Sequence, residues 1–168
     1  RLNGIFAFAI WGKKDQALFL ARDRLGVKPL FYAQAGQGLV FASELKGLLA
    51  HPAVEPRLGA EGLSEVLVMG PGRTPGHGIF EEVYELKPGH WLLFDRGGTR
   101  QGRYWTLTSH PHTDDLKVTV GRVRELLQDA VQRQLVSDVP ICTLLSGGLD
   151  SSAVTAFAAA AYRAQGRT

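Results

Sequence analysis

Short apolar stretches separated by turn-forming residues dominate the first third of the chain and predict β-strands. GIFAFAIW (4–11) and QALFLARD (16–23) flank the turn sequence GKKD, an arrangement typical of an antiparallel hairpin. PLFYAQ (29–34) and LVFASE (39–44) flank AGQG in the same way. Because these stretches are almost continuously apolar, we expect the four strands to form a sheet that another layer covers.

Helical spacing and further turns follow the first strands. SELKGLLAH (43–51) places three leucines on one face, with Ser43 as the expected cap, and predicts a short helix. GAEGLSEVLVMG (59–70) predicts another, followed by a loop rich in glycine and proline. VYELKPGHWLLFD (83–95) predicts two strands around a Pro-Gly turn, and a further glycine turn leads into RYWTL (103–107).

The pattern changes after a polar stretch at residues 108–117, which we interpret as a linker. Residues 118–135 have apolar side chains at helical spacing. VPICTLL (139–145) predicts a buried strand, SGGLDSS (146–152) a loop, and the alanine-rich stretch 153–165 a helix. The order helix–strand–loop–helix indicates the beginning of a parallel α/β sheet.

Composition places the chain among globular proteins and excludes several other classes. The chain has 168 residues, 45% of them hydrophobic, and no apolar run approaches the roughly 20 residues that span a bilayer. Its net charge of +3 is scattered, which argues against a nucleic-acid surface. Cys142 is the only cysteine, so we expect a buried small hydrophobe, no internal disulfide and a cytoplasmic protein. Because the chain begins at Arg1 and stops soon after a helix, we expect an internal fragment.

The stretch SGGLDSS has the chemistry of a phosphate-binding loop. A strand, a glycine turn and a helix start bring backbone N–H groups and the positive helix end to one point. Gly147 and Gly148 let the backbone approach an anion, and serine hydroxyls add donors. Asp150 fits either of two roles: it could cap the helix, or its carboxylate could hold Mg²⁺ between itself and the phosphates. A plain glycine turn with a Ser/Asp cap is the alternative interpretation.

SGGLDSS resembles the pyrophosphate loop of the ATP-pyrophosphatase superfamily, and the longer stretch 137–154 resembles the start of the synthetase domain of glutamine-dependent asparagine synthetases. The preceding half resembles the class II glutamine amidotransferase domain of the same enzymes. The stretches that carry this second resemblance are GIFAFAIW (4–11), ARDRLGVKPLFY (21–32), FASELKGLL (41–49) and GIFEEVYELKPGHWLLF (78–94). Together the two resemblances cover nearly the whole chain.

The resemblance implies a fold in two parts. Residues 1–107 would be the C-terminal part of an α+β amidotransferase domain of the Ntn-hydrolase type. Residues 118–168 would begin an α/β ATP-pyrophosphatase domain with a parallel sheet.

The resemblance also implies a reaction and a set of site residues. Aspartate would be adenylated by ATP with Mg²⁺ and then attacked by ammonia from glutamine, through a β-aspartyl-AMP intermediate, to give asparagine, AMP and pyrophosphate. It implies no nucleic-acid or membrane partner and admits a homodimer. Asp150 would be the Mg²⁺ ligand, and the residues that would bind ATP are Leu145, Ser146, Gly147, Gly148, Leu149, Asp150, Ser151 and Ser152.

The residue that releases ammonia in this family, an N-terminal cysteine, has no counterpart in the chain. Cys142 lies in the predicted synthetase strand, so the catalytic nucleophile stays unknown and we expect the fragment alone to make no asparagine. Asn3 precedes a glycine but matches a later stretch than the catalytic Asn-Gly pair of the family. Arg22 and Asp23 are expected to lock the following loop, and Glu44 is expected to be a buried cap or ion-pair partner.

Three other interpretations remain open. A β-lactam synthetase-like enzyme or a lasso-peptide cyclase-like enzyme would adenylate a different acceptor. A binding module without catalysis would keep only the sheet and the loop.

Overall fold

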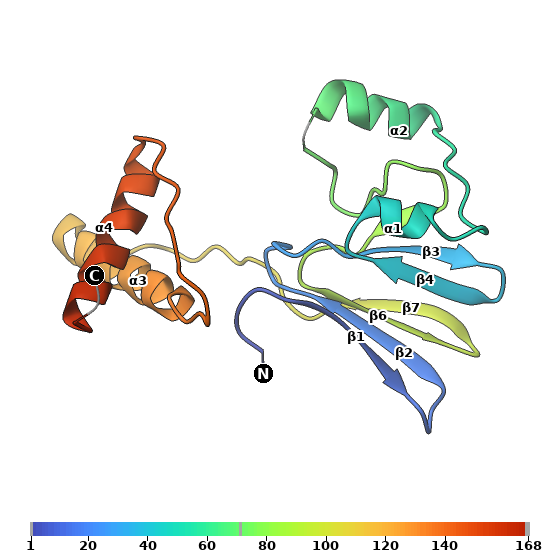
Figure 1. The fold of residues 1–168 in the computed structure, drawn as a ribbon, viewed down its shortest axis with the longest axis horizontal. Coiled ribbons are helices and arrows are strands. Elements are labelled where there is room, and N and C mark those ends of the chain that lie inside the picture. Colours follow the sequence, from blue (N-terminus) through green and yellow to red (C-terminus); the bar gives the residue numbers. More distant parts are fainter. Residues whose placement is uncertain (1, 71, 167–168) are drawn as a thin grey trace. The chain divides into compact units, whose positions relative to one another are not determined.

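The computed structural model describes residues 2–70 and 72–166. The chain divides into two compact units, Arg1–Thr108 and Ser109–Thr168. The first unit contains all the described strands and the second contains two helices (Figure 1). Each unit is considered by itself below.

One sheet of the first unit has the strand order β1-β2-β6-β7 and is antiparallel throughout. β1 (Ala7–Gly12) and β2 (Ala17–Arg22) form the first predicted hairpin, which is confirmed. β6 (His90–Asp95) pairs with β2 and with β7 (Gly98–Arg103). The glycine turn was expected to lead into the stretch 103–107. The strand that follows it is instead β7, which begins at Gly98 and ends at Arg103.

The second sheet has the order β4-β3-β5. β3 (Phe31–Ala35) and β4 (Gly38–Ala42) form the second predicted hairpin, and β3 also pairs with β5 (Val83–Glu85). Both hairpins are therefore confirmed, but the expectation that they share a sheet is wrong. β2 pairs with β6 and β3 pairs with β5, so the two hairpins lie in different sheets.

The main core joins residues from the two sheets. Leu20 of β2 and Leu92 of β6 pack with Tyr32 of β3 and with Leu30 and Leu86 beside the second sheet, and all of these side chains are buried. Alternation along β2 and β6 sends Phe19 and Trp91 to the opposite face of the first sheet. There the aromatic rings form a row, with neighbouring centroids 5.5 to 6.2 Å apart, through Phe6, Phe8, Phe19 and Trp91.

One short helix packs on the second sheet (Figure 1). α1 (Leu45–Leu49) packs Leu48 against Phe31 and Ala33 in a second core cluster. Its cap position is occupied by Glu44 without a side-chain hydrogen bond, so the expected Ser43 cap is wrong. The expected single helix over 59–70 is α2 (Ala60–Ser64) continued by a turn of π-helix, η1 (Glu65–Met69).

The second unit contains α3 (Leu116–Gln134) and α4 (Leu149–Ala164). Asp115 caps α3, accepting a hydrogen bond of 2.8 Å from the Val118 amide, so the helix begins inside the stretch interpreted as linker. The strand expected at 139–145 is not formed. The described residues of this unit supply no other strand to pair with it, and an extended segment without a ladder partner leaves its backbone to water. Cys142 is consequently exposed and not buried as expected.

Candidate functional site

The predicted phosphate loop lies at the beginning of α4. Gly147 has φ +83°, a left-handed conformation that favours glycine, and Gly148 is the cap residue of the helix. α4 starts at Leu149, four residues before the expected start at 153. Residues 149–152 therefore form the first turn of the helix and only 146–148 form the turn before it.

Two serines hold the loop closed across this turn. The Ser146 amide donates to the Ser151 hydroxyl at 3.3 Å, and the two hydroxyl oxygens are 3.0 Å apart. The Ser151 hydroxyl in turn donates to the Gly148 carbonyl at 3.2 Å. The structure thus brings Ser146, Gly148 and Ser151 together, while the Ser152 amide makes the first helical bond, to the Gly148 carbonyl at 3.1 Å.

The remaining predicted site residues face water. The side chains of Leu145 and Leu149 are exposed and apolar, so only the backbone groups of these residues could bind a phosphate. Asp150 is exposed in the first helical turn, and its carboxylate forms no hydrogen bond or ion pair with another described residue.

This arrangement fits a phosphate group. No side chain caps the N-terminus of α4, so the amides of Leu149, Asp150 and Ser151 remain available, and the helix dipole favours an anion there. Among the described residues no group of three or more His, Cys, Asp or Glu side chains could hold a metal ion by itself. A single carboxylate at Asp150 fits the way Mg²⁺ is held when the ligand's phosphates and water supply the other oxygens.

A contact that the sequence analysis did not anticipate ties the segment before the loop to α4. The Thr155 hydroxyl donates to the Thr143 hydroxyl at 3.1 Å. Thr143 lies in the predicted strand and Thr155 in the second turn of the helix. Only their spacing on either side of the loop could have suggested this pair.

The first unit contains a buried polar network at the end of β2. Arg22 Nη2 lies 3.0 Å from Glu85 Oε1, and both side chains are buried. The same guanidinium donates to the carbonyls of Lys28, Leu86 and Gly26, each at 2.7 Å. The expected lock on the loop by an ion pair and backbone bonds is confirmed, and Glu85 is the partner that the sequence did not reveal.

Asp23 supplies the other half of this lock. Its carboxylate accepts hydrogen bonds from the amides of Leu25, Val27 and Lys28 at 2.9 to 3.2 Å. Burial by itself would raise the pKa of the Asp23 carboxyl, but the backbone donors outweigh it and hold that pKa below its ordinary value. Asp23 is therefore a structural anion that organises the loop.

The other charged candidates of the first unit are surface groups. Glu44 is exposed and pairs with Lys46 at 2.6 Å, so the expected ion pair is confirmed and the expected burial is wrong. Asn3 accepts a hydrogen bond of 3.2 Å from Arg24, whose guanidinium lies over the Trp105 ring. No described acid or base adjoins Asn3 in a catalytic arrangement.

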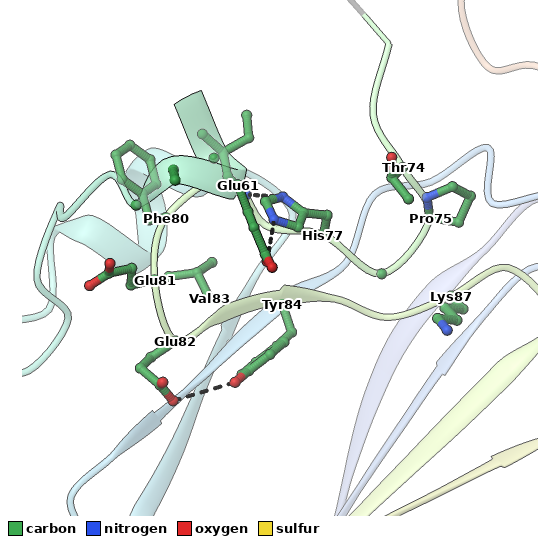
Figure 2. A pocket seen from close by; sticks show the side chains of 15 residues that line it. Glu61, Thr74, Pro75, His77, Phe80, Glu81, Glu82, Val83, Tyr84 and Lys87 are labelled. Atoms are coloured by element: carbon green, nitrogen blue, oxygen red, sulfur yellow. Dashed lines mark hydrogen bonds and ion pairs between the residues drawn. The ribbon is translucent and has the colours of Figure 1, made fainter. Parts of the chain in front are cut away.

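A cavity of about 620 Å³ lies between α2 and the segment leading into β5 (Figure 2). In the close-up, Glu61 reaches towards His77, 3.9 Å away, and Tyr84 donates to Glu82 at 3.4 Å. Its wall is tightly packed, since a Cβ on Gly62 would come within 1.8 Å of the Ile79 carbonyl oxygen. Ile79 has φ +70°, a strained conformation for a β-branched residue. The sequence analysis did not anticipate this cavity.

Comparison with known proteins agrees with the two-part architecture. Residues 1–105 match the glutamine amidotransferase domain family, and residues 122–168 match the asparagine synthase family. The chain therefore belongs to the glutamine amidotransferase domain family, and its residues 122–168 also match the asparagine synthase family.

Individual relatives carry the names of asparagine synthetases and of an amidase. Asparagine synthetase [glutamine-hydrolyzing] 3 of Bacillus subtilis is 55% identical over 99% of this chain and 27% of its own length. Asparagine synthetase [glutamine-hydrolyzing] 2 of the same organism is 37% identical over 93% of this chain and 22% of its own. Amidase chry2 of Gibberella zeae is 38% identical over 91% and 23%. The chain thus spans about a quarter of the length of these relatives.

A solved structure adds no further argument. Glutamine phosphoribosylpyrophosphate amidotransferase from B. subtilis aligns with 86% of this chain and 29% of its own, at 18% identity and a TM-score of only 0.32. Within the described residues, no helix is both long and apolar enough to cross a membrane.

Proposed function

We propose that the polypeptide containing this chain is a glutamine-hydrolysing asparagine synthetase. It uses ATP to adenylate the side-chain carboxylate of aspartate, and ammonia from glutamine then displaces AMP to give asparagine; pyrophosphate is the other product. One observation carries the proposal: an amidotransferase unit is followed, in the same chain, by an asparagine synthase segment with a phosphate-type loop. Neither part alone would point to this reaction.

In the proposed site, the loop 145–152 holds the phosphates of ATP. The free amides at the start of α4 face the anion, and the positive end of the helix lowers its electrostatic energy. Gly147 and Gly148 keep side chains out of the approach. The serine pair Ser146–Ser151 fixes the turn in advance, so little reorganisation is needed when the nucleotide binds.

Asp150 is the proposed Mg²⁺ ligand. Its carboxylate extends from the first turn of α4 and is not engaged by another described side chain. Bound Mg²⁺ would neutralise charge that builds up on the pyrophosphate leaving group. In this role Asp150 would hold the ion, and the ion's positive charge would offset the repulsion between the carboxylate and the phosphates.

The first unit contributes the frame of the glutamine site. The Arg22–Glu85 pair and Asp23 fix the segment after β2 against both sheets. Enzymes in general place reactive loops on rigid scaffolds, because small displacements of reacting groups slow catalysis strongly. We assign these three residues to positioning and none of them to proton transfer.

Aspartate, glutamine and ATP are the proposed small-molecule partners of a cytoplasmic enzyme, and the family resemblance admits a homodimer. The scattered charge and the single unpaired cysteine support a protein of the cytoplasm that binds neither nucleic acid nor membrane.

The proposal is tested with the complete polypeptide that contains residues 1–168. Asparagine formation is measured with aspartate, ATP and Mg²⁺, using either glutamine or ammonium as the nitrogen source. We expect asparagine from both, with one pyrophosphate per asparagine. If pyrophosphate release requires an acceptor other than aspartate, the protein is a β-lactam synthetase-like or lasso-peptide cyclase-like enzyme. If no acceptor supports nucleotide turnover, it is a binding module.

The nitrogen source has its own test. We expect the mature N-terminal residue of the complete protein, identified by mass spectrometry of its terminal peptide, to be cysteine, whose thiol and α-amine can act as nucleophile and base. Another residue there would leave the nucleotide chemistry in place and exclude glutamine hydrolysis by this mechanism.

A further inference from the structure

We draw no further inference here: the strongest candidate, the apolar outer face of the β1-β2-β6-β7 sheet with its row of aromatic rings from Phe6 to Trp91, is an unpartnered surface, and nothing in the structure shows what covers it.

Discussion

Arg22 on β2 and Glu85 on β5 form a buried ion pair that connects the two sheets of the first unit, with 3.0 Å between Nη2 and Oε1. The guanidinium also satisfies three backbone carbonyls, so the pair closes a complete polar network inside an apolar core. Removing one partner leaves the other charged and buried. Such a loss is much more costly than the net contribution of the intact pair.

We therefore expect Glu85→Gln to lower the free energy of unfolding by about 3 kcal/mol. Urea unfolding of the 168-residue chain, followed by tryptophan fluorescence, measures it. Glu44→Gln is the matched control, because Glu44 pairs with Lys46 at the surface and the loss of an exposed ion pair should change the stability very little. Equal effects of the two substitutions would contradict the structural role of the buried pair.

Asp23 predicts a specific dependence of stability on pH. Its pKa in the folded state lies below the ordinary value of 3.8, so the ionised carboxylate stabilises the fold above that value. This contribution is lost as the pH falls through 3.8 towards the lower folded pKa. Asp23→Asn should destabilise the chain at neutral pH and make its acid unfolding less steep below pH 4. If wild type and variant lose stability in parallel over this range, the assignment is wrong.

Two glycines, one in the wall of the cavity beside α2 and one in α3, should respond in opposite ways to replacement by alanine. Gly62→Ala places a methyl group against the Ile79 backbone and should destabilise the chain by about 1–3 kcal/mol. Gly121→Ala, in the middle of α3 with open space around it, should stabilise the chain by about 0.5–1 kcal/mol through helix propensity. Thermal unfolding followed by circular dichroism separates the two. A neutral Gly62→Ala would mean that α2 does not pack on this segment.

Much of the first unit could be predicted from its sequence, because each hairpin is specified locally. Short, almost continuously apolar stretches with a turn between them are sufficient for β1–β2 and β3–β4. Their separation into two sheets could not be predicted, since it depends on pairing with strands far along the chain, such as Leu20 with Leu92. Glu85 was missed for the same reason: a glutamate in an apolar stretch shows no partner until the fold brings Arg22 to it.

For the loop at 146–152, the sequence predicted the chemistry of the site better than the structure of the segment before it. Its residue types predicted a phosphate site directly, and its glycine turn and helix start are present. The strand before it was predicted from β-branched and apolar residues at 139–145. Propensity cannot form a strand without a neighbouring ladder, and this segment has none among the described residues. Cys142 is exposed as a consequence.

Gly148→Ala separates the nucleotide-binding role of the loop from its stability. Gly148 has φ −77°, which alanine adopts freely, and an added Cβ would be 3.7 Å from the Ser146 hydroxyl, an ordinary contact. We expect unchanged thermal stability but ATP binding at least tenfold weaker in the complete protein, because the methyl group stands where phosphate approaches. Isothermal titration calorimetry with ATP and Mg²⁺ measures this. Gly147→Ala, at φ +83°, should distort the turn as well.

Asparagine synthesis with Asp150 as the Mg²⁺ ligand is tested by measuring aspartate-dependent release of pyrophosphate from ATP. The measurement compares the complete wild-type polypeptide with its Asp150→Ala variant. Asp138→Ala, which removes an exposed carboxylate from the segment before the loop, is the control. We expect wild type and Asp138→Ala to release pyrophosphate only when aspartate is present, and Asp150→Ala to release none while keeping its fold. Undiminished release by Asp150→Ala would contradict the metal-binding role of Asp150, and release that ignores aspartate would contradict asparagine synthesis itself.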